Sequence, residues 1–491
     1  MRSIDYILFA AYLSGILGIG LFFARRKQTV AEFHVANRAM KWLPMGCSIV
    51  AAGIGAINFT QFSEEVFLNG LYVTMAIPVF GLVAWPVWKW IIPFFHETAP
   101  LTAYEYLERR FDLNVRRLAS ALFIIWRGFW MAVVLYATAA FLSAVTGIDK
   151  RVLIIITGSI ATAYTFAGGM RAIILTDMVQ FAVLFGSLTA GAIVSANMHG
   201  GFMEVIHTAA RGGQLKPFHP FDPAILSFDP TIRMTVWSVS IGALTAYLSR
   251  YGVDQRIVQR YFTARSLQDA RRAFMLNIVL SVLTLSFLAF IGLAIYAFTV
   301  ATVPPGTKLA SMQPLALFIK SLPFGICGLL VSGLCASTMA SIDSGVHSCC
   351  TALTTDFLNP RRHDDAGAGE RQHAWADRWL TAGLGAAATC IAMYMHNLGS
   401  IFEIANRVIN GLGSPLLGLF FIGWFGTRSI TARGVFLGGI AGIAFSIYTG
   451  FAVKPLALHY YAVVNLLATI LFCYLFSAIS RAPGSVTAQE P

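Results

Sequence analysis

Apolar stretches recur along almost the whole chain, from residue 6 to residue 480, and short polar segments separate them. A helix needs about 20 mostly apolar residues to cross the hydrocarbon of a bilayer, and in lipid its backbone polar groups must be satisfied internally. The pattern therefore predicts an all-α integral membrane protein with about 13 spanning helices. The expected spans are residues 6–24, 43–67, 70–95, 117–146, 151–168, 173–198, 234–250, 273–300, 324–356, 378–396, 401–425, 434–451 and 457–480.

The composition agrees with this interpretation. Of 491 residues, 57% are hydrophobic and 12% are charged, against roughly 45–50% and about 25% in soluble domains. These values exclude a water-soluble core and a nucleic-acid-binding protein. The seven cysteines are odd in number and lie in apolar runs, so we expect neither a disulfide framework nor a zinc site. The first span is followed by a cluster of basic residues (Arg25, Arg26 and Lys27), which favours a retained helix over a signal peptide.

The formal net charge of +12 is interpreted first as a signal of membrane topology, because cytoplasmic loops collect lysine and arginine. If the N-terminus lies outside, 23 of the 35 lysines and arginines fall in cytoplasmic loops, nine fall outside and three lie within spans. We therefore predict a multi-pass protein of the plasma (inner) membrane with a cytoplasmic C-terminus. The predicted cytoplasmic loops include the arginine-rich stretch 250–272.

Ionisable residues at bilayer depth are costly and mark functional positions. Arg127 lies about 15 Å into its span, close to the midplane. Glu403 and Arg407 are spaced i, i+4, so mutual neutralisation is an alternative to function for this pair. The complete set is Arg127, Asp177, Asp343, His347, Glu403 and Arg407.

A stripe of serines follows one face of the ninth span. Ser337, Ser341, Ser344 and Ser348 recur at steps of three or four residues, with Asp343 beside them. Hydroxyl, carbonyl and carboxylate oxygens suit a hard cation. Taken alone, the stripe better fits small residues that let helices approach closely.

The second span favours a cation site over simple packing, because Gly46, Gly53 and Gly55 interrupt a run that otherwise predicts a continuous helix. Non-helical backbone at bilayer depth is tolerated where it lines a cavity, and a broken helix exposes carbonyl groups that bind a cation. The two spans together therefore predict a two-sided cation site. Glycines that serve only close packing are the alternative.

Several segments along the chain together resemble the sodium:solute symporter family, whose members transport glucose, proline, iodide, monocarboxylates, vitamins and sialic acid. Besides the serine stripe, they are residues 102–111, 168–171, 176–180, 254–261, 411–418 and 432–434. The resemblance implies a LeuT-type core of two inverted five-helix repeats, in residues 43–198 and 234–425, with the extracellular loop 199–233 between them. One extra helix in residues 1–42 precedes the core, and two in 426–480 follow it, before a disordered tail at 481–491.

The resemblance also implies where coupling ions bind. At the principal sodium site the carbonyl ligands would be Ala51, Ile54 and Ser337, and the hydroxyl ligand Ser341. Many members have a second hydroxyl where this chain has Ala340, so the site is one ligand poorer.

Some members have a second sodium site, whose positions here are Asp177, Asp343 and Ser344. Where those members have one carboxylate and serines, this chain has two carboxylates. This departure predicts either tighter sodium binding or a protonated carboxyl group, because like charges raise a pKa. His347, four residues after Asp343, makes a proton relay conceivable.

The implied substrate pocket is more apolar than one built for a sugar, since it combines Gly55, Asn58, Phe59, Gln61, Ile77 and Trp130. In related sialic acid carriers an arginine stands at the position of Trp130. Arg127 lies three residues earlier on nearly the same face. We therefore expect a small organic anion, such as a monocarboxylate or a sialic acid, held by Arg127. A structural ion pair of Arg127 with an acidic residue elsewhere is the alternative.

The expected function is sodium-coupled symport of this solute by alternating access, in a monomer that needs the bilayer, a sodium ion and no other cofactor. The alternatives are a proton-coupled symporter that uses Asp343 and His347, a sugar or vitamin substrate, and an ion channel or solute sensor. The chain has no HExxH or GxSxG motif, which argues against an enzyme.

Overall fold

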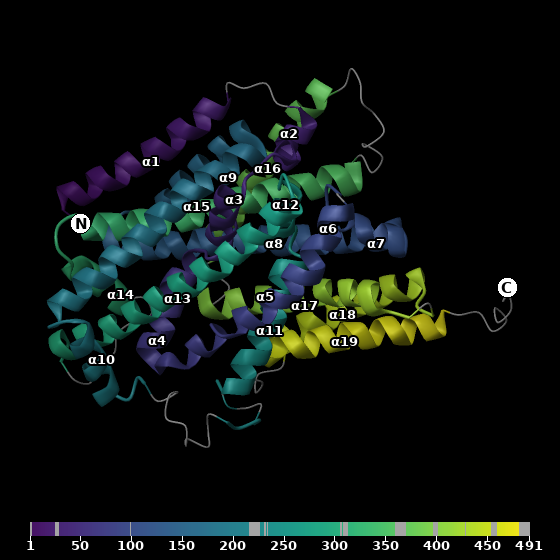
Figure 1. Ribbon diagram of the computed structural model, residues 1–491. Coiled ribbons are helices and arrows are strands. Elements are labelled where there is room, and N and C mark those ends of the chain that lie inside the picture. The colour runs from purple at the N-terminus through teal and green to yellow at the C-terminus, as the bar shows by residue number, and fades with distance from the viewer. Residues whose placement is uncertain are drawn as a thin grey trace, which may run out of the picture.

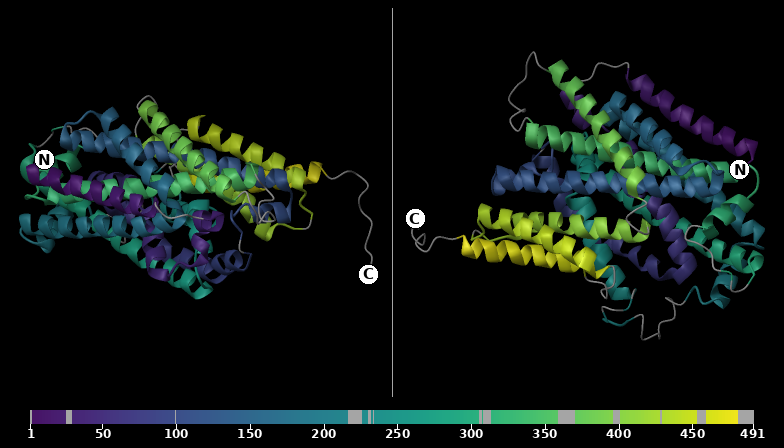
Figure 2. Two further views of the ribbon diagram at one scale, coloured as in Figure 1. Left: turned by 90° about the horizontal axis from the view of Figure 1, so that it is seen from above. Right: turned by 180° about the vertical axis from the view of Figure 1, so that it is seen from behind.

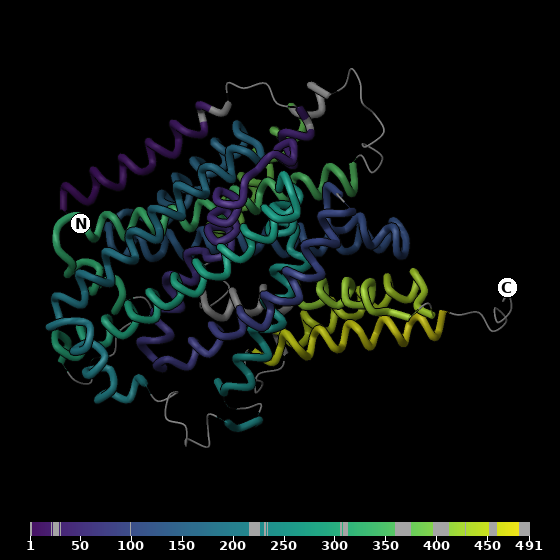
Figure 3. Tube along the Cα trace, in the orientation of Figure 1, coloured from purple at the N-terminus to yellow at the C-terminus, as the bar shows by residue number. Residues whose placement is uncertain are grey.

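The computed structural model describes residues 2–24, 29–98, 100–215, 226–229, 232, 234–304, 307, 313–358, 370–395, 401–427, 429–452 and 459–480. Within these residues the chain is helical, and its β-structure is limited to one isolated bridge between Met40 and Ala264. The long helices run side by side in a flattened bundle (Figures 1 and 2). Helix α1 begins at one end of the bundle and α19 ends at the opposite end (Figure 3).

The α-helices are α1 (Ser3–Ala24), α2 (Val30–Val35), α3 (Trp42–Gly53), α4 (Ser63–Asn69), α5 (Val79–Pro86), α6 (Ile92–Thr98), α7 (Glu105–Arg110), α8 (Leu113–Thr146), α9 (Lys150–Met198), α10 (Phe202–Arg211), α11 (Val236–Gly252), α12 (Gln255–Phe262), α13 (Leu267–Thr302), α14 (Gln313–Ser321), α15 (Ile326–Leu353), α16 (Glu370–Tyr394), α17 (Ile401–Phe425), α18 (Ala432–Ala452) and α19 (Tyr460–Ile479). Shorter helical segments are η1 (Ala36–Arg38), η2 (Asn58–Phe62), η3 (Leu71–Ala76), η4 (Val87–Ile91) and η6 (Thr354–Leu358).

The predicted class, an all-α membrane protein, is confirmed. In the described part of the chain, 8 helical stretches are long and apolar enough to cross a membrane, or up to 9 if the bent pair α3 and η2–α4 counts as one span. The count of thirteen stays a prediction. Within the expected extracellular loop 199–233 the chain forms α10, and the tail 481–491 lies outside the described residues.

Helix α9 is two antiparallel helical halves rather than one rod. Gly169 has φ 61° and ψ −176°, a conformation that glycine adopts without a steric penalty. Gln180 Nε2 donates to Tyr164 Oη at 3.3 Å. In a straight helix residues 16 positions apart would be separated by about 24 Å, beyond the reach of these side chains. The chain therefore reverses between them, as expected for spans 151–168 and 173–198.

The predicted break in the second span is confirmed. Helix α3 ends at Gly53, and the axis of the helical segment that starts at Asn58 is bent by 65° from it. Ile54 N–H still bonds to the Val50 carbonyl, whereas Asn58 N–H returns to the Gly55 carbonyl at 2.9 Å. The last carbonyl groups of α3 thus have no donor from their own helix, which leaves them for other partners.

A second break lies where the sequence pattern predicts a cytoplasmic loop. Helix α11 ends at Gly252, and Asp254 caps α12 by accepting the Arg256 N–H at 3.1 Å. All eight residues of α12 are buried, including Arg256 and Arg260 at 3% and 1% exposure. Interpreting these two arginines as loop charges was therefore wrong. They are buried because carboxylates and carbonyl groups of neighbouring helices receive their guanidinium groups.

Candidate cation and substrate site

The break after α3 faces the middle of α15. Ser337 Oγ donates to the Ile54 carbonyl at 3.0 Å. Ser341 is 1% exposed, and its Oγ has no hydrogen-bond partner among the described residues. A Cβ added to Gly55 would lie 2.9 Å from this oxygen, so glycine lets the broken backbone approach the serine stripe. The structure thus brings together Ile54, Ser337 and Ser341, and Ala51 lies in the last turn of α3.

Among the described residues, neither the Ser341 hydroxyl nor the Ile54 carbonyl group has a hydrogen bond from a charged side chain, and such oxygen atoms suit a hard cation such as sodium. A buried hydroxyl without a partner costs free energy unless a ligand satisfies it, and carbonyl groups at a helix C-terminus carry partial negative charge. No group of three or more histidine, cysteine, aspartate or glutamate side chains that could hold a metal ion occurs among the residues described. The hydroxyl and carbonyl oxygen atoms at the break are ligands that favour a hard alkali cation over a softer transition metal.

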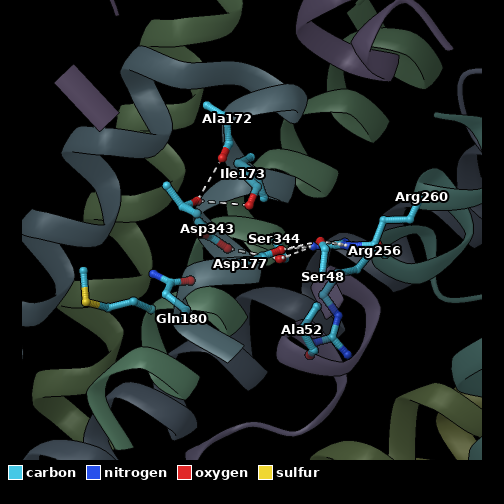
Figure 4. A network of polar contacts seen from close by, with 12 residues as sticks. Ser48, Ala52, Ala172, Ile173, Asp177, Gln180, Arg256, Arg260, Asp343 and Ser344 are labelled. Atoms are coloured by element: carbon cyan, nitrogen blue, oxygen red, sulfur yellow. Dashed lines mark hydrogen bonds and ion pairs between the residues drawn. The ribbon is translucent and has the colours of Figure 1, made fainter. Parts of the chain in front are cut away.

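Three residues further along α15, at Ser344, the predicted second site has a different arrangement (Figure 4). Asp177 and Ser344 do come together, but around the guanidinium of Arg260. Arg260 Nη2 lies 2.7 Å from Asp177 Oδ2 and 2.7 Å from Ser344 Oγ, and Arg260 Nε donates to Ser48 Oγ at 2.6 Å. Ser48 Oγ in turn donates to Asp177 Oδ2 at 2.6 Å. An arginine side chain thus contacts two of the expected second-site ligands.

Asp343 completes this cluster from the other side. Ser344 Oγ donates to Asp343 Oδ1 at 3.0 Å, and Tyr164 Oη donates to Asp343 Oδ2 at 2.7 Å. His347 is buried, but neither of its ring nitrogens has a hydrogen-bond partner within the described segments. The contact between His347 and Asp343 that a proton relay requires is therefore not formed in this conformation.

Arg127 has the structural partner that the sequence left open. Its Nη2 forms a buried ion pair with Asp254 Oδ2, and its guanidinium lies 4.3 Å from the ring centroid of Trp126. Arg256 shares Asp254 at 3.3 Å and also donates from Nη1 to the Ala52 carbonyl. Two arginines thus share one aspartate here, whereas Arg260 pairs with Asp177 and reaches Asp343 through Ser344. In their ionised forms the three arginines and three aspartates of this network sum to zero charge.

Two cavities lie beside the break. The first, of about 50 Å³, is lined by residues that include Gly55, Arg127, Trp130 and Ser341. The second, of about 180 Å³, is lined by residues that include Asn58. Both cavities are lined by Arg250 and Ala246.

The other expected pocket residues lie apart from these two cavities. Gln61 Nε2 donates to Glu64 at 3.3 Å, Phe59 is buried at 2% exposure, and Ile77 packs against the hydrophobic core. The side chains of Glu403 and Arg407 lie outside the described residues.

The model of the sodium:solute symporter family matches residues 33–442. The chain belongs to this family. A sodium/sialic acid symporter of Aliivibrio fischeri is 27% identical over 485 residues, which are 96% of this chain and 92% of the relative. Sodium-coupled monocarboxylate transporter 1 of Homo sapiens is 29% identical over 91% of this chain and 73% of its own. A sodium-dependent multivitamin transporter of Oryctolagus cuniculus is 31% identical over 91% of this chain and 70% of its own.

A solved structure of a Na⁺-coupled sialic acid symporter, in a substrate-bound outward-open state, superposes with a TM-score of 0.86 over 98% of each chain at 24% identity. This likeness confirms the symporter fold.

Arg250 is a residue of this symporter that sequence reasoning missed, because it stands at the end of a span and was counted among the cytoplasmic charges. It lines both cavities, and its guanidinium lies 5.6 Å from the Tyr247 ring centroid. Among the described residues it has no carboxylate within ion-pair distance. The only available sequence signal is its place four residues before Asp254, and that spacing does not reveal which residue pairs with the aspartate.

Proposed function

We propose that the protein is a sodium-coupled symporter that imports a small organic anion by alternating access, with sodium as its coupling ion and no other cofactor. Family membership supports sodium coupling, since the relatives above are sodium-coupled carriers of sialic acid and monocarboxylates. The observation that carries the proposal is the unpartnered, buried Ser341 hydroxyl opposite the broken helix. We further propose a monomer in the plasma (inner) membrane, with an outside N-terminus and a cytoplasmic C-terminus.

The proposed sodium ligands are the carbonyl groups of Ala51, Ile54 and Ser337 and the hydroxyl of Ser341. Sodium at this position bridges α3 and α15 and thereby favours one relative position of these helices. Solute binding beside the break depends on the same position, so each ligand tightens the binding of the other by the same factor. Release of sodium into a low-sodium cytoplasm lets the helices separate and the solute leave.

The charges around the cavities support an anionic substrate. Arg127, Arg256 and Arg260 each pair with an aspartate, which leaves Arg250 as a cation without a carboxylate partner among the described residues. We propose that Arg250 binds the substrate carboxylate, with Trp126 and Trp130 as an aromatic wall beside it. Arg127, which already pairs with Asp254, then serves as a structural residue.

The second cation site at Asp177, Asp343 and Ser344 stays a prediction, as does proton coupling through Asp343. An additional cation there would require Arg260 to withdraw from Asp177 and Ser344. Because Arg260 already binds two of these residues, we propose a single sodium ion in the conformation described.

The test is uptake into sealed proteoliposomes under an imposed sodium gradient, after a thermal-shift screen across monocarboxylates, sialic acids, sugars and amino acids with and without sodium. We expect carboxylates to stabilise the protein only with sodium, and uptake to stop when choline replaces sodium. Uptake that depends on a pH gradient but not on sodium would contradict sodium coupling.

Two variants locate the carboxylate contact. Arg250→Gln should raise the half-saturating concentration of the carboxylate by roughly 10- to 100-fold, the equivalent of one hydrogen bond to a charged group. The neutral amide of the same solute, as a competitor, should bind both proteins alike. Arg127→Gln, which leaves Asp254 paired with Arg256, should keep carboxylate affinity within about threefold of the parent. If the Arg127 variant weakened carboxylate binding and Arg250→Gln did not, Arg127 would be the residue that binds the carboxylate.

A further inference from the structure

A groove of about 920 Å³ opens on the surface of the bundle where α3, η4 and α13 meet, away from the two cavities. It begins at a tryptophan-rich edge and continues along one face of α13. The residues that matter are Trp42, Trp88, Arg271, Arg272, Met275 and Val279.

Two arginines form one end of this groove. Arg271 Nε donates to the Trp88 carbonyl at 3.2 Å, and its guanidinium lies 4.3 Å from the Trp88 ring centroid. These contacts orient the side chain and leave both Nη groups without a hydrogen bond among the described residues. Arg272 is exposed. Asp269, one turn earlier, is already paired with Arg265 at 2.6 Å, so it does not neutralise the pair.

The rest of the groove is apolar. Met275 and Val279 are 42% and 53% exposed and follow Arg271 by one and two turns on the same face of α13. Residues 271 and 279 are therefore separated by about 12 Å along the helix axis. Because the apolar span is expected to begin at residue 273, the arginines lie at the membrane boundary and the apolar face continues into the hydrocarbon. Trp42 and Trp88 occupy the interfacial level that tryptophan prefers.

We propose that this groove binds one anionic glycerophospholipid, with its phosphate between Arg271 and Arg272 and an acyl chain along Met275 and Val279. Basic pockets between membrane helices bind anionic head groups. A zwitterionic lipid would place its own cation beside the two guanidinium groups. A free phosphate would leave the apolar face uncovered, and a second copy related by a two-fold axis would bring another arginine pair against this one.

The test is native mass spectrometry of the full-length protein in detergent, with phosphatidylglycerol and phosphatidylcholine of identical acyl chains and inorganic phosphate as added ligands. We expect one phosphatidylglycerol to bind at concentrations where phosphatidylcholine and phosphate do not. Arg271→Gln with Arg272→Gln should weaken that binding roughly 10- to 30-fold. The matched control is Arg109→Gln with Arg433→Gln, which removes two exposed arginines of the same expected membrane face and should change nothing.

Met275→Trp tests the apolar half without a change of charge, and it should weaken phosphatidylglycerol binding by filling the groove. Equal binding of the two lipids, or unchanged binding in the Arg271→Gln, Arg272→Gln variant, would overturn the proposal. A dimer that this variant dissociates would assign the groove to a second copy instead. All variants should retain the thermal unfolding temperature of the parent, since both arginines project from the surface.

Discussion

Helix α15 contributes to two polar sites less than two turns apart, and they satisfy their oxygen atoms in opposite ways. At Ser341 a hydroxyl faces the carbonyl groups of a broken helix and has no partner among the described residues. At Ser344 the guanidinium of Arg260 binds the hydroxyl and the neighbouring Asp177. The comparison teaches that at one site an arginine side chain of the protein itself supplies the cation that the buried oxygen atoms require. At the other site, we propose that an ion from solution supplies it.

The largest effect should come from the arginine. Arg260→Ala leaves Asp177 and Asp343 buried without a counter-charge, which costs about 3–5 kcal/mol when one partner of a buried pair is removed. Thermal unfolding in detergent should show this loss. Asp177→Asn in the same protein should recover most of it. A single Arg260→Ala variant as stable as the parent would remove the contrast between the two sites.

The next effect concerns the unpartnered hydroxyl. Ser341→Ala should raise the sodium concentration for half-maximal uptake roughly 10- to 100-fold, by analogy with one hydrogen bond to a charge, about 1.5–3 kcal/mol. Ser348→Ala is the matched control, because Ser348 Oγ already donates to the Gly345 carbonyl at 3.0 Å. Equal sodium dependence in both variants would place the ion elsewhere.

A smaller effect should follow from crowding the same oxygen. Gly55→Ala puts a methyl group 2.9 Å from Ser341 Oγ, whereas at Gly53 the nearest atom beyond the helix is Arg250 Nη1 at 3.9 Å. We expect Gly55→Ala to weaken sodium activation by about tenfold, the size of an overpacking penalty of about 1–2 kcal/mol. Gly53→Ala should stay near the parent. If Gly53→Ala proved the more damaging, sodium would not lie at the Gly55 side of the break.

The smallest effect should be a gain in sodium affinity. Ala340→Ser restores a hydroxyl at the position where many family members have one, and it should lower the half-maximal sodium concentration about two- to fivefold, around 0.5–1 kcal/mol. Sodium titration of uptake measures this change. A Ser341→Ala, Ala340→Ser double variant should partly regain sodium affinity. If it does not, the added hydroxyl points away from the ion.

Much of the fold was predictable from the apolar spans, because lipid leaves few alternatives to the helix. The reversal near Gly169 and the break between Gly53 and Gly55 were also predictable, since glycine interrupts otherwise regular patterns. Helix α12 was not predictable from the sequence, because eight residues with two arginines have the composition of a solvated loop. Burial of those arginines depends on Asp177 and on the end of α3, which approach only in three dimensions.

The candidate site was predictable to a similar extent. The serine stripe and the glycines predicted the junction between the broken helix and α15 that the structure shows, and its role as a sodium site stays a prediction. The partner of Arg127 lies 127 positions away, and no local pattern reveals it. For the same reason the sequence did not distinguish Arg250 from its neighbours: which arginine lacks a partner depends on how Asp254 divides its two carboxylate oxygens.

The contacts between α12 and α3 have a mechanical consequence. Arg256 binds the Ala52 carbonyl and Arg260 binds Ser48, so residues one turn apart on one helix are fastened to residues one turn apart on the other. Two contacts oppose both translation and rotation of α12 relative to α3, whereas a single contact would allow rotation about it. Helices α3 and α12 thus form one mechanical unit, so a displacement of one displaces the other.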